Sequence, residues 1–114
     1  MTVTVKNIFE ITGVTAGAED FATLFKSHGA RVERIVSRSH SSPPGFWYDQ
    51  DEEEWVLVVC GSATLEFASG EVVELKAGDY LTIARHAKHR VVRTSEATIW
   101  LAVHMIGNTA AAAG

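Results

Sequence analysis

The chain has 114 residues, 46% of them hydrophobic and 21% charged, a length that predicts one domain (residues 1–114) and excludes a two-domain enzyme. Fourteen acidic against ten basic residues give a formal net charge of −4, which disfavours nucleic acid as a partner. The apolar runs are far shorter than the roughly 20 residues that cross a bilayer, and Cys60 is the single cysteine, so we expect a cytoplasmic protein that binds no membrane.

The first thirty residues predict an extended arm followed by a short helix. Phe21, Leu24 and Phe25 recur at i, i+3 and i+4 within residues 18–27, a spacing that suits one face of an amphipathic helix. Acidic residues near the start of this segment and Lys26 near its end match the helix dipole. We therefore expect residues 1–30 to form an arm and one short helix that packs on the rest of the domain.

From residue 31 onward, turn residues separate short segments rich in Val and Ile, a pattern typical of antiparallel β-structure. The expected strands lie near residues 31–38, 45–50, 54–60, 62–68, 71–76, 80–84, 89–94 and 97–105. This number of strands predicts an all-β fold, a jelly roll or small β-barrel over residues 31–105. The tail, residues 108–114, has no large apolar side chain to anchor it and is expected to be disordered.

Two of the expected strands are apolar on both faces. Residues 55–59 and 99–103 carry almost no polar side chain, so each face needs cover from a second sheet, the N-terminal segment or a partner chain. We therefore expect a homodimer.

Strand alternation turns two polar side chains toward the interior. Glu54 shares its face with Val56 and Val58, and His89 shares its face with Val91. A carboxylate on a buried face is costly unless it is paired, hydrogen-bonded or bound to a metal. The preceding acidic residues 51–53 lie in a turn-like segment and are expected to face solvent.

Other side chains near these two could line a pocket. Phe46, Tyr48 and Gln50 alternate on one side of an extended stretch, where they either line a pocket or belong to the core and a turn. His86 lies three residues before His89, and two histidines this close raise the expectation of a metal ligand. His104 fits either the core or the site.

The segment from Gly45 to Arg93 resembles the two-motif core of the cupin superfamily. The first cupin motif contains His-x-His, three or four residues, Glu, six residues and Gly; here Glu54 and Gly61 keep the last part. With three intervening residues, the two histidine positions fall on Tyr48 and Gln50, so both histidines are replaced.

The second cupin motif is kept in spacing more than in identity. Gly78 and His89 stand at the positions of the motif's first glycine and its histidine. Ala84, His86 and Arg93 occupy the proline, second glycine and asparagine positions. The resemblance therefore implies a jelly-roll barrel over this half of the chain.

In the superfamily, the two histidines and the Glu of the first motif and the histidine of the second bind a divalent metal such as Zn, Fe, Mn or Ni. The resemblance thus implies that Glu54 and His89 are metal ligands, with Gln50 at a third ligand position. His86 could supply the missing imidazole. An amide is a weaker ligand than imidazole for late transition metals, so such a set would bind metal less tightly.

Two functions follow from this pattern. The first is a cupin that binds a divalent metal ion and a small-molecule ligand in the barrel, with Phe46, Tyr48 and His104 lining the pocket. The alternative is a metal-free, small-molecule-binding or sensory cupin without catalytic activity; a purely structural dimer module is a third reading. The superfamily includes dioxygenases, isomerases and lyases, and no nucleophile, phosphate loop or dinucleotide motif singles out a catalytic residue or a reaction.

A basic stretch near His89 bears on the ligand. Arg85, Lys88, Arg90 and Arg93 either attract an anionic substrate to the barrel mouth or are outward-facing, solubilising charges; we favour the second.

Overall fold

The computed structural model describes residues 2–106, in which all regular secondary structure is β-strand. The strands are β1 (Glu19–Lys26), β2 (Ala30–Ser37), β3 (Glu53–Cys60), β4 (Ser62–Phe67), β5 (Val72–Lys76), β6 (Tyr80–Ile83), β7 (His89–Thr94) and β8 (Thr98–Met105). Among these residues no helix is long and apolar enough to span a membrane.

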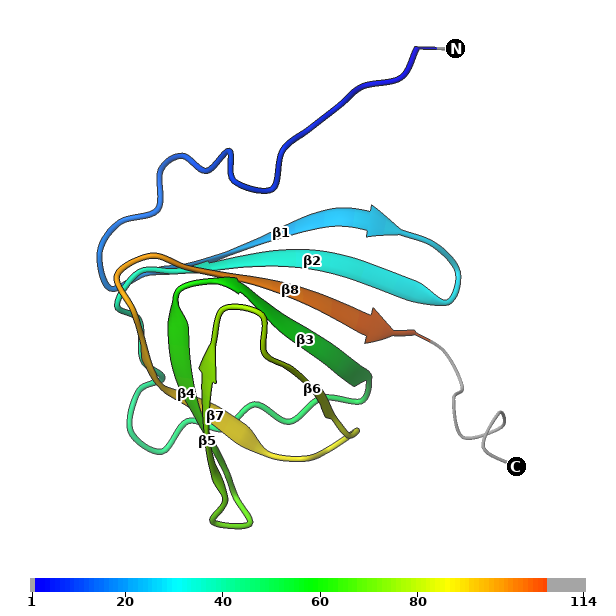
Figure 1. Cartoon of the computed structure of the whole chain (residues 1–114). Helices are drawn as coiled ribbons and strands as arrows, with labels where there is room; N and C mark the ends of the chain where they lie inside the picture. Colours follow the sequence, from blue (N-terminus) through cyan, green and yellow to red (C-terminus); the bar gives the residue numbers. More distant parts are fainter. Residues whose placement is uncertain (1, 107–114) are drawn as a thin grey trace.

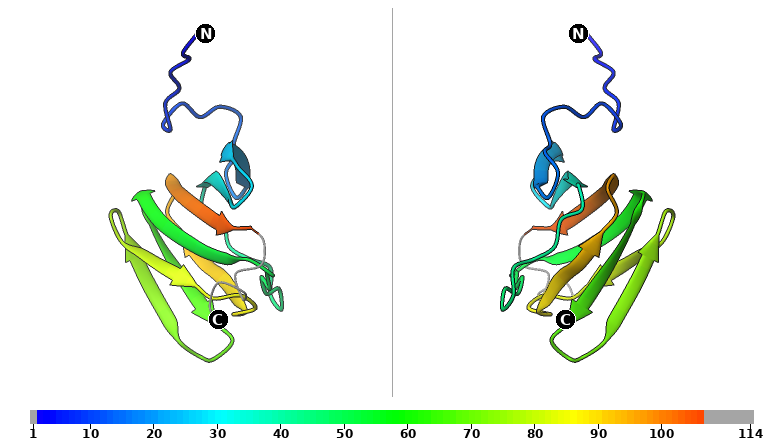
Figure 2. Two further views of the ribbon diagram at one scale, coloured as in Figure 1. Left: turned by 90° about the vertical axis from the view of Figure 1, so that its right-hand side faces the viewer. Right: turned by 90° about the vertical axis from the view of Figure 1, so that its left-hand side faces the viewer.

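The strands form two antiparallel sheets. The larger sheet has the order β1-β2-β8-β3-β6, and the smaller has the order β5-β4-β7. The two sheets face each other around a common interior (Figure 1), and the side views show the same two layers (Figure 2). This arrangement is the jelly-roll β-barrel that the sequence predicts.

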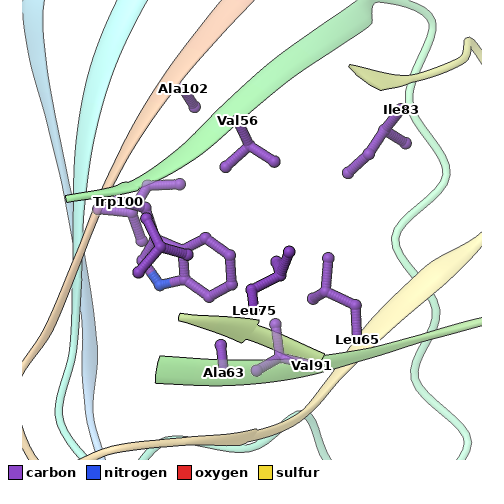
Figure 3. Close-up of a cluster of buried hydrophobic side chains, with 10 residues drawn as sticks. Val56, Ala63, Leu65, Leu75, Ile83, Val91, Trp100 and Ala102 are labelled. Atoms are coloured by element: carbon purple, nitrogen blue, oxygen red, sulfur yellow. The ribbon is translucent and has the colours of Figure 1, made fainter. Parts of the chain in front are cut away.

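The interior is filled by the inward faces of strands from both sheets. Val56, Leu65, Val91 and Trp100 belong to one buried apolar cluster. Their side chains meet between the sheets, with the indole of Trp100 in the middle (Figure 3). Because side chains alternate along a strand, the polar residues that share parity with this cluster also point inward.

The chain crosses from the larger sheet to the smaller at Gly61, between β3 and β4. Its φ is +85°, a left-handed conformation that glycine adopts without strain. A Cβ at this position would collide with the backbone of Ala97 and Thr98. The glycine that ends the first cupin-like motif is therefore required by the close approach of the two chain segments.

The predicted N-terminal helix is wrong. Residues 19–26 form β1, an edge strand that pairs with β2 along its length and carries a bulge between Thr23 and Phe25. A helix of this length is marginal by itself, whereas the free edge of β2 supplies a complete set of backbone partners. Phe21 and Phe25 remain largely exposed on β1, so the apolar spacing does not reflect burial of a helix face.

The other expected strands agree with the structure except one. Residues 45–50 are not a strand; Tyr48 alone forms an isolated bridge with His89. Pro43, Pro44 and Gly45 precede this stretch, and prolines cannot donate to a ladder. The expected disordered tail, residues 108–114, lies outside the described residues.

Candidate functional site

A cavity of about 60 Å³ lies inside the barrel between the two sheets. Apolar side chains such as Val56, Val91 and Trp100 form much of its wall. The polar side chains come from five strands and from the segment before β3: Glu19, Glu33, Tyr48, Gln50, Glu54, His89 and His104.

Glu54 is placed in the cavity by β3, which pairs with β8 and β6. Its residue is only 6% exposed, and within residues 2–106 its carboxylate makes no hydrogen bond or ion pair. Burial raises the pKa of Glu54, and the positive charge of a protonated His104 opposes that shift. The site therefore favours the neutral carboxyl more than water does.

His89 enters the cavity from β7, in the opposite sheet. Its Nδ1 lies 2.8 Å from the carbonyl oxygen of Ala87, which can only accept, so Nδ1 carries a proton in this contact. Burial lowers the pKa of His89, and the bond to Ala87 opposes this in part. The ring is therefore neutral at pH 7, and it leaves Nε2 as an acceptor with no partner among the described residues.

Tyr48 stacks on His89 and bonds to Glu19, another residue of the cavity wall. The two ring centroids are 5.4 Å apart with planes 24° from parallel. The phenol donates to Glu19 Oε1 at 2.9 Å, and Ser37 donates to Oε2 at 3.1 Å. Burial, followed by the charge of Glu19, raises the pKa of Tyr48, so the phenol stays protonated and keeps donating. Trp100 completes this chain by donating to Ser37 at 3.1 Å.

A second polar chain starts at His104, which is 3% exposed. Its Nε2 lies 3.2 Å from Glu33 Oε1, and its Nδ1 lies 3.6 Å from Glu52 Oε1. Arg31 contacts both oxygens of Glu52, at 3.2 and 3.4 Å, and lies 3.9 Å from Glu33. These charges are thus balanced within their own network, and Nδ1 of His104 is buried there without a hydrogen-bond partner among the described residues.

This network corrects one expectation about the acidic run. Glu52 is half-buried and bound by Arg31 rather than free in solvent, whereas Asp51 and Glu53 are exposed as expected.

Similarity to known proteins agrees with the fold and with the motif spacing. A family model described as "Cupin domain" matches residues 38–104. The chain belongs to the cupin family. A protein of Ralstonia eutropha JMP134 that carries the provisional name mannose-6-phosphate isomerase is 41% identical, with a TM-score of 0.84 over 92% of this chain and 100% of that one.

More distant solved structures share the fold alone. A cupin superfamily protein of Desulfitobacterium hafniense DCB-2 is 14% identical, with a TM-score of 0.70 over 84% of each chain. The polyketide cyclase RemF of Streptomyces resistomycificus is 17% identical, with a TM-score of 0.70 over 91% of this chain and 80% of that one. No curated protein matches the sequence significantly.

Three of the four residues predicted as metal ligands line the cavity of this cupin: Gln50, Glu54 and His89. His86 does not. Its φ of +60° turns the chain away from the barrel, and its ring nitrogens lie 2.8 Å from Asp49 and 3.3 Å from Asp51 on the surface. His86 thus joins two surface loops instead of restoring the missing imidazole.

The remaining donors match the family's metal site only in part. Tyr48 stands at a histidine position of the first motif, but its phenol is bonded to Glu19. Within residues 2–106, no three His, Cys, Asp or Glu side chains are grouped so as to hold a metal ion. One carboxylate, one imidazole and one amide form a poor set for a late transition metal.

Of the three residues predicted to line the pocket, two do so and one does not. Tyr48 and His104 line the cavity, whereas Phe46 is 42% exposed and packs edge-on against Tyr48 with ring centroids 4.8 Å apart. Sequence reasoning missed Glu19 and Glu33. Glu33 shares strand parity with the buried Ile35, a signal that could have found it.

Proposed function

We propose that this cupin binds a small organic molecule directly through side chains of its cavity, with no metal ion between them. The observation that carries the proposal is the pair Glu54 and His89. Both are 6% exposed and line the cavity, and among residues 2–106 neither the carboxylate nor Nε2 has a hydrogen-bond partner. A polar atom that opens onto a cavity without a protein partner is free to bond a ligand, so a bound molecule that supplies these bonds explains why both are kept.

The name of the Ralstonia relative raises mannose 6-phosphate as a candidate ligand. Phosphate groups are held by Arg, Lys or clustered backbone N–H groups. The cavity is lined by Glu19, Glu33 and Glu54 and by no Lys or Arg. Arg90, from the basic stretch, is bound to Glu66 at 3.3 Å and to the Ser42 carbonyl at 3.0 Å. We therefore do not propose a sugar phosphate as the ligand of this chain.

Titration with small probes tests the proposal. The cavity volume corresponds to roughly four to six water molecules, which suits probes of about five non-hydrogen atoms. We expect at least one of n-butanol, n-butylamine and butyrate, added with EDTA present, to shift the side-chain ¹⁵N resonances of His89 saturably. His28, outside the cavity, serves as the internal control. The absence of any saturable shift at His89 up to about 100 mM probe would reject the proposal.

A divalent metal ion held by Gln50, Glu54 and His89 is the second candidate. One observation favours it: a backbone carbonyl fixes Nδ1 of His89, the arrangement in which a histidine presents Nε2 to a metal. Elemental analysis of protein purified without chelators tests it. About one Zn, Fe, Mn or Ni per chain, lost in both Glu54→Gln and His89→Gln, would establish this site, and near-zero content in the wild-type protein would reject it.

We also propose that a second copy of the chain covers the outer face of the larger sheet. There Val103 lies between Val32 and Trp55, and Leu57 lies between Leu101 and Tyr80, so six apolar side chains adjoin. Tyr80 is 66% exposed. A twofold interface places the same patch on both chains, which makes an uncharged patch self-complementary.

Light scattering coupled to size-exclusion chromatography measures this association. The wild-type protein is expected at the mass of a dimer and Tyr80→Arg at the mass of a monomer. Val72→Arg, at a position on the smaller sheet that is 58% exposed, is the matched control and should remain dimeric. A monomeric wild-type protein would contradict the proposal.

A cytoplasmic location is proposed as well, supported by Cys60, which is a free thiol. Fractionation of cells that express the protein tests it, and recovery outside the cytoplasmic fraction would reject it.

A further inference from the structure

Glu54 and His89 both present hydrogen-bond acceptors to the cavity. The Ala87 carbonyl holds the proton of His89 on Nδ1, so Nε2 offers only a lone pair. An ionised Glu54 carboxylate also offers only lone pairs. A ligand that satisfies both groups must therefore bring the donors itself.

No hydrogen bond or ion pair reaches Glu54 within residues 2–106, although the charges of His104 and Arg31 lie close enough to act on it. Of the other cavity carboxylates, Glu19 accepts from the hydroxyls of Tyr48 and Ser37, and Glu33 faces the Nε2 of His104. The nearby guanidinium, that of Arg31, is bound to both oxygens of Glu52 outside the cavity. Glu54 is thus the one cavity carboxylate among the described residues without a hydrogen bond or ion pair.

We infer that the ligand carries a protonated amine, which donates to the Glu54 carboxylate and to Nε2 of His89. An ammonium group has three donors and no acceptor, and it brings a positive charge that can pair directly with Glu54. The aromatic residues Tyr48 and Trp100 line the same cavity, and aromatic rings can attract a cation. This inference rests on the proposed ligand-binding function and specifies the chemical class of the ligand.

A comparison of the three four-carbon probes tests the inference. Affinities are measured by the His89 resonances at pH 7.5 with EDTA present, which removes any contribution from a bound metal. n-Butylamine is expected to bind about tenfold or more tightly than n-butanol, the difference expected of a charge-assisted hydrogen bond. Butyrate is expected to bind most weakly, because it adds a negative charge beside three carboxylates.

Substitution at two neighbouring positions identifies the charge responsible. Glu54→Gln keeps the size of the side chain and removes its charge. It should therefore weaken the binding of n-butylamine about tenfold to a hundredfold and change the affinity for n-butanol less than about threefold. Glu53→Gln, on the exposed face of the same strand, is the matched control and should change neither.

The results separate this inference from the function on which it rests. Binding of n-butanol or butyrate as tight as that of n-butylamine would overturn the amine inference and leave the ligand-binding proposal intact. Unchanged amine affinity in Glu54→Gln would also overturn it. No binding of any probe would reject both.

Discussion

Two carboxylate and imidazole pairs in this barrel have opposite surroundings. Glu33 and His104 are 3.2 Å apart and continue into Glu52 and Arg31. Glu54 and His89 are just as inward-facing, yet neither the Glu54 carboxylate nor Nε2 of His89 has a partner within residues 2–106. The first pair supports the fold, and the second pair is arranged for a molecule that the chain does not contain.

The difference follows from the sheets that carry the residues. Glu33 and His104 lie on β2 and β8, which are neighbours in one sheet, so their side chains meet directly. Glu54 and His89 lie on β3 and β7, in different sheets, so they face the cavity from two sides. Glu33 and His104 are thus bonded within one sheet, whereas Glu54 and His89 leave the space between the two sheets open to a ligand.

The largest expected effect is on the bonded pair, Glu33 and His104. Glu33→Leu leaves His104 with a buried, unpartnered Nε2 and removes one carboxylate near Arg31. We expect a loss of about 2 kcal/mol in the free energy of unfolding, measured by urea denaturation. Glu53→Leu, an exposed position, is the control and should change stability by less than about 0.5 kcal/mol. A loss no larger than that of the control would mean that the network does not support the fold.

The unpartnered pair should behave in the opposite sense. Glu54→Leu places an apolar side chain beside Val56 and removes a buried carboxyl group, so we expect the protein to gain about 1 kcal/mol. Because the folded-state pKa of Glu54 is raised, wild-type stability falls as pH rises above about 4.5, and the gain should be larger at pH 8 than at pH 4.5. A loss similar to that of Glu33→Leu would remove the distinction between the pairs.

The smallest effect concerns His89 in acid. Its folded-state pKa is lowered, so below about pH 6.5 the unfolded chain binds more protons than the folded one, and stability falls as pH decreases. We expect His89→Gln to reduce the decline in thermal midpoint between pH 7.5 and pH 5. His28→Gln is the control at an exposed histidine. An identical decline in wild type and His89→Gln would contradict the neutral, buried imidazole.

Alternation along strands makes part of this site predictable from the sequence. Glu54 shares a face with Val56, and His89 with Val91, so the residue pattern alone is enough to place both inside the barrel. The same rule predicts that Glu33 points inward, because Glu33 shares a strand face with the buried Ile35. It fails for Glu19, because residues 19–26 have helix-like spacing and become a strand only by pairing with β2.

The other failures come from loops, where alternation does not apply. His86 is three residues from His89 in sequence, but a left-handed turn sends its ring to the surface between Asp49 and Asp51. Phe46 precedes Tyr48 by two residues, yet residues 45–50 are not a strand and the side chain stays partly exposed. The surroundings of a loop side chain depend on backbone angles that spacing alone does not specify.

The central position of β8 has a consequence for how the site can change. Its backbone is hydrogen-bonded to β2 on one side and β3 on the other, and its inward face carries Trp100, which reaches Glu19 through Ser37, and His104. Amide hydrogens of β8 should therefore exchange only on global unfolding, while those of the edge strand β1 exchange by local opening. A shift of β8 by one residue would turn both Trp100 and His104 to the outer face of the sheet. The register of β8 therefore holds both polar chains in place, and a change of register would break them together.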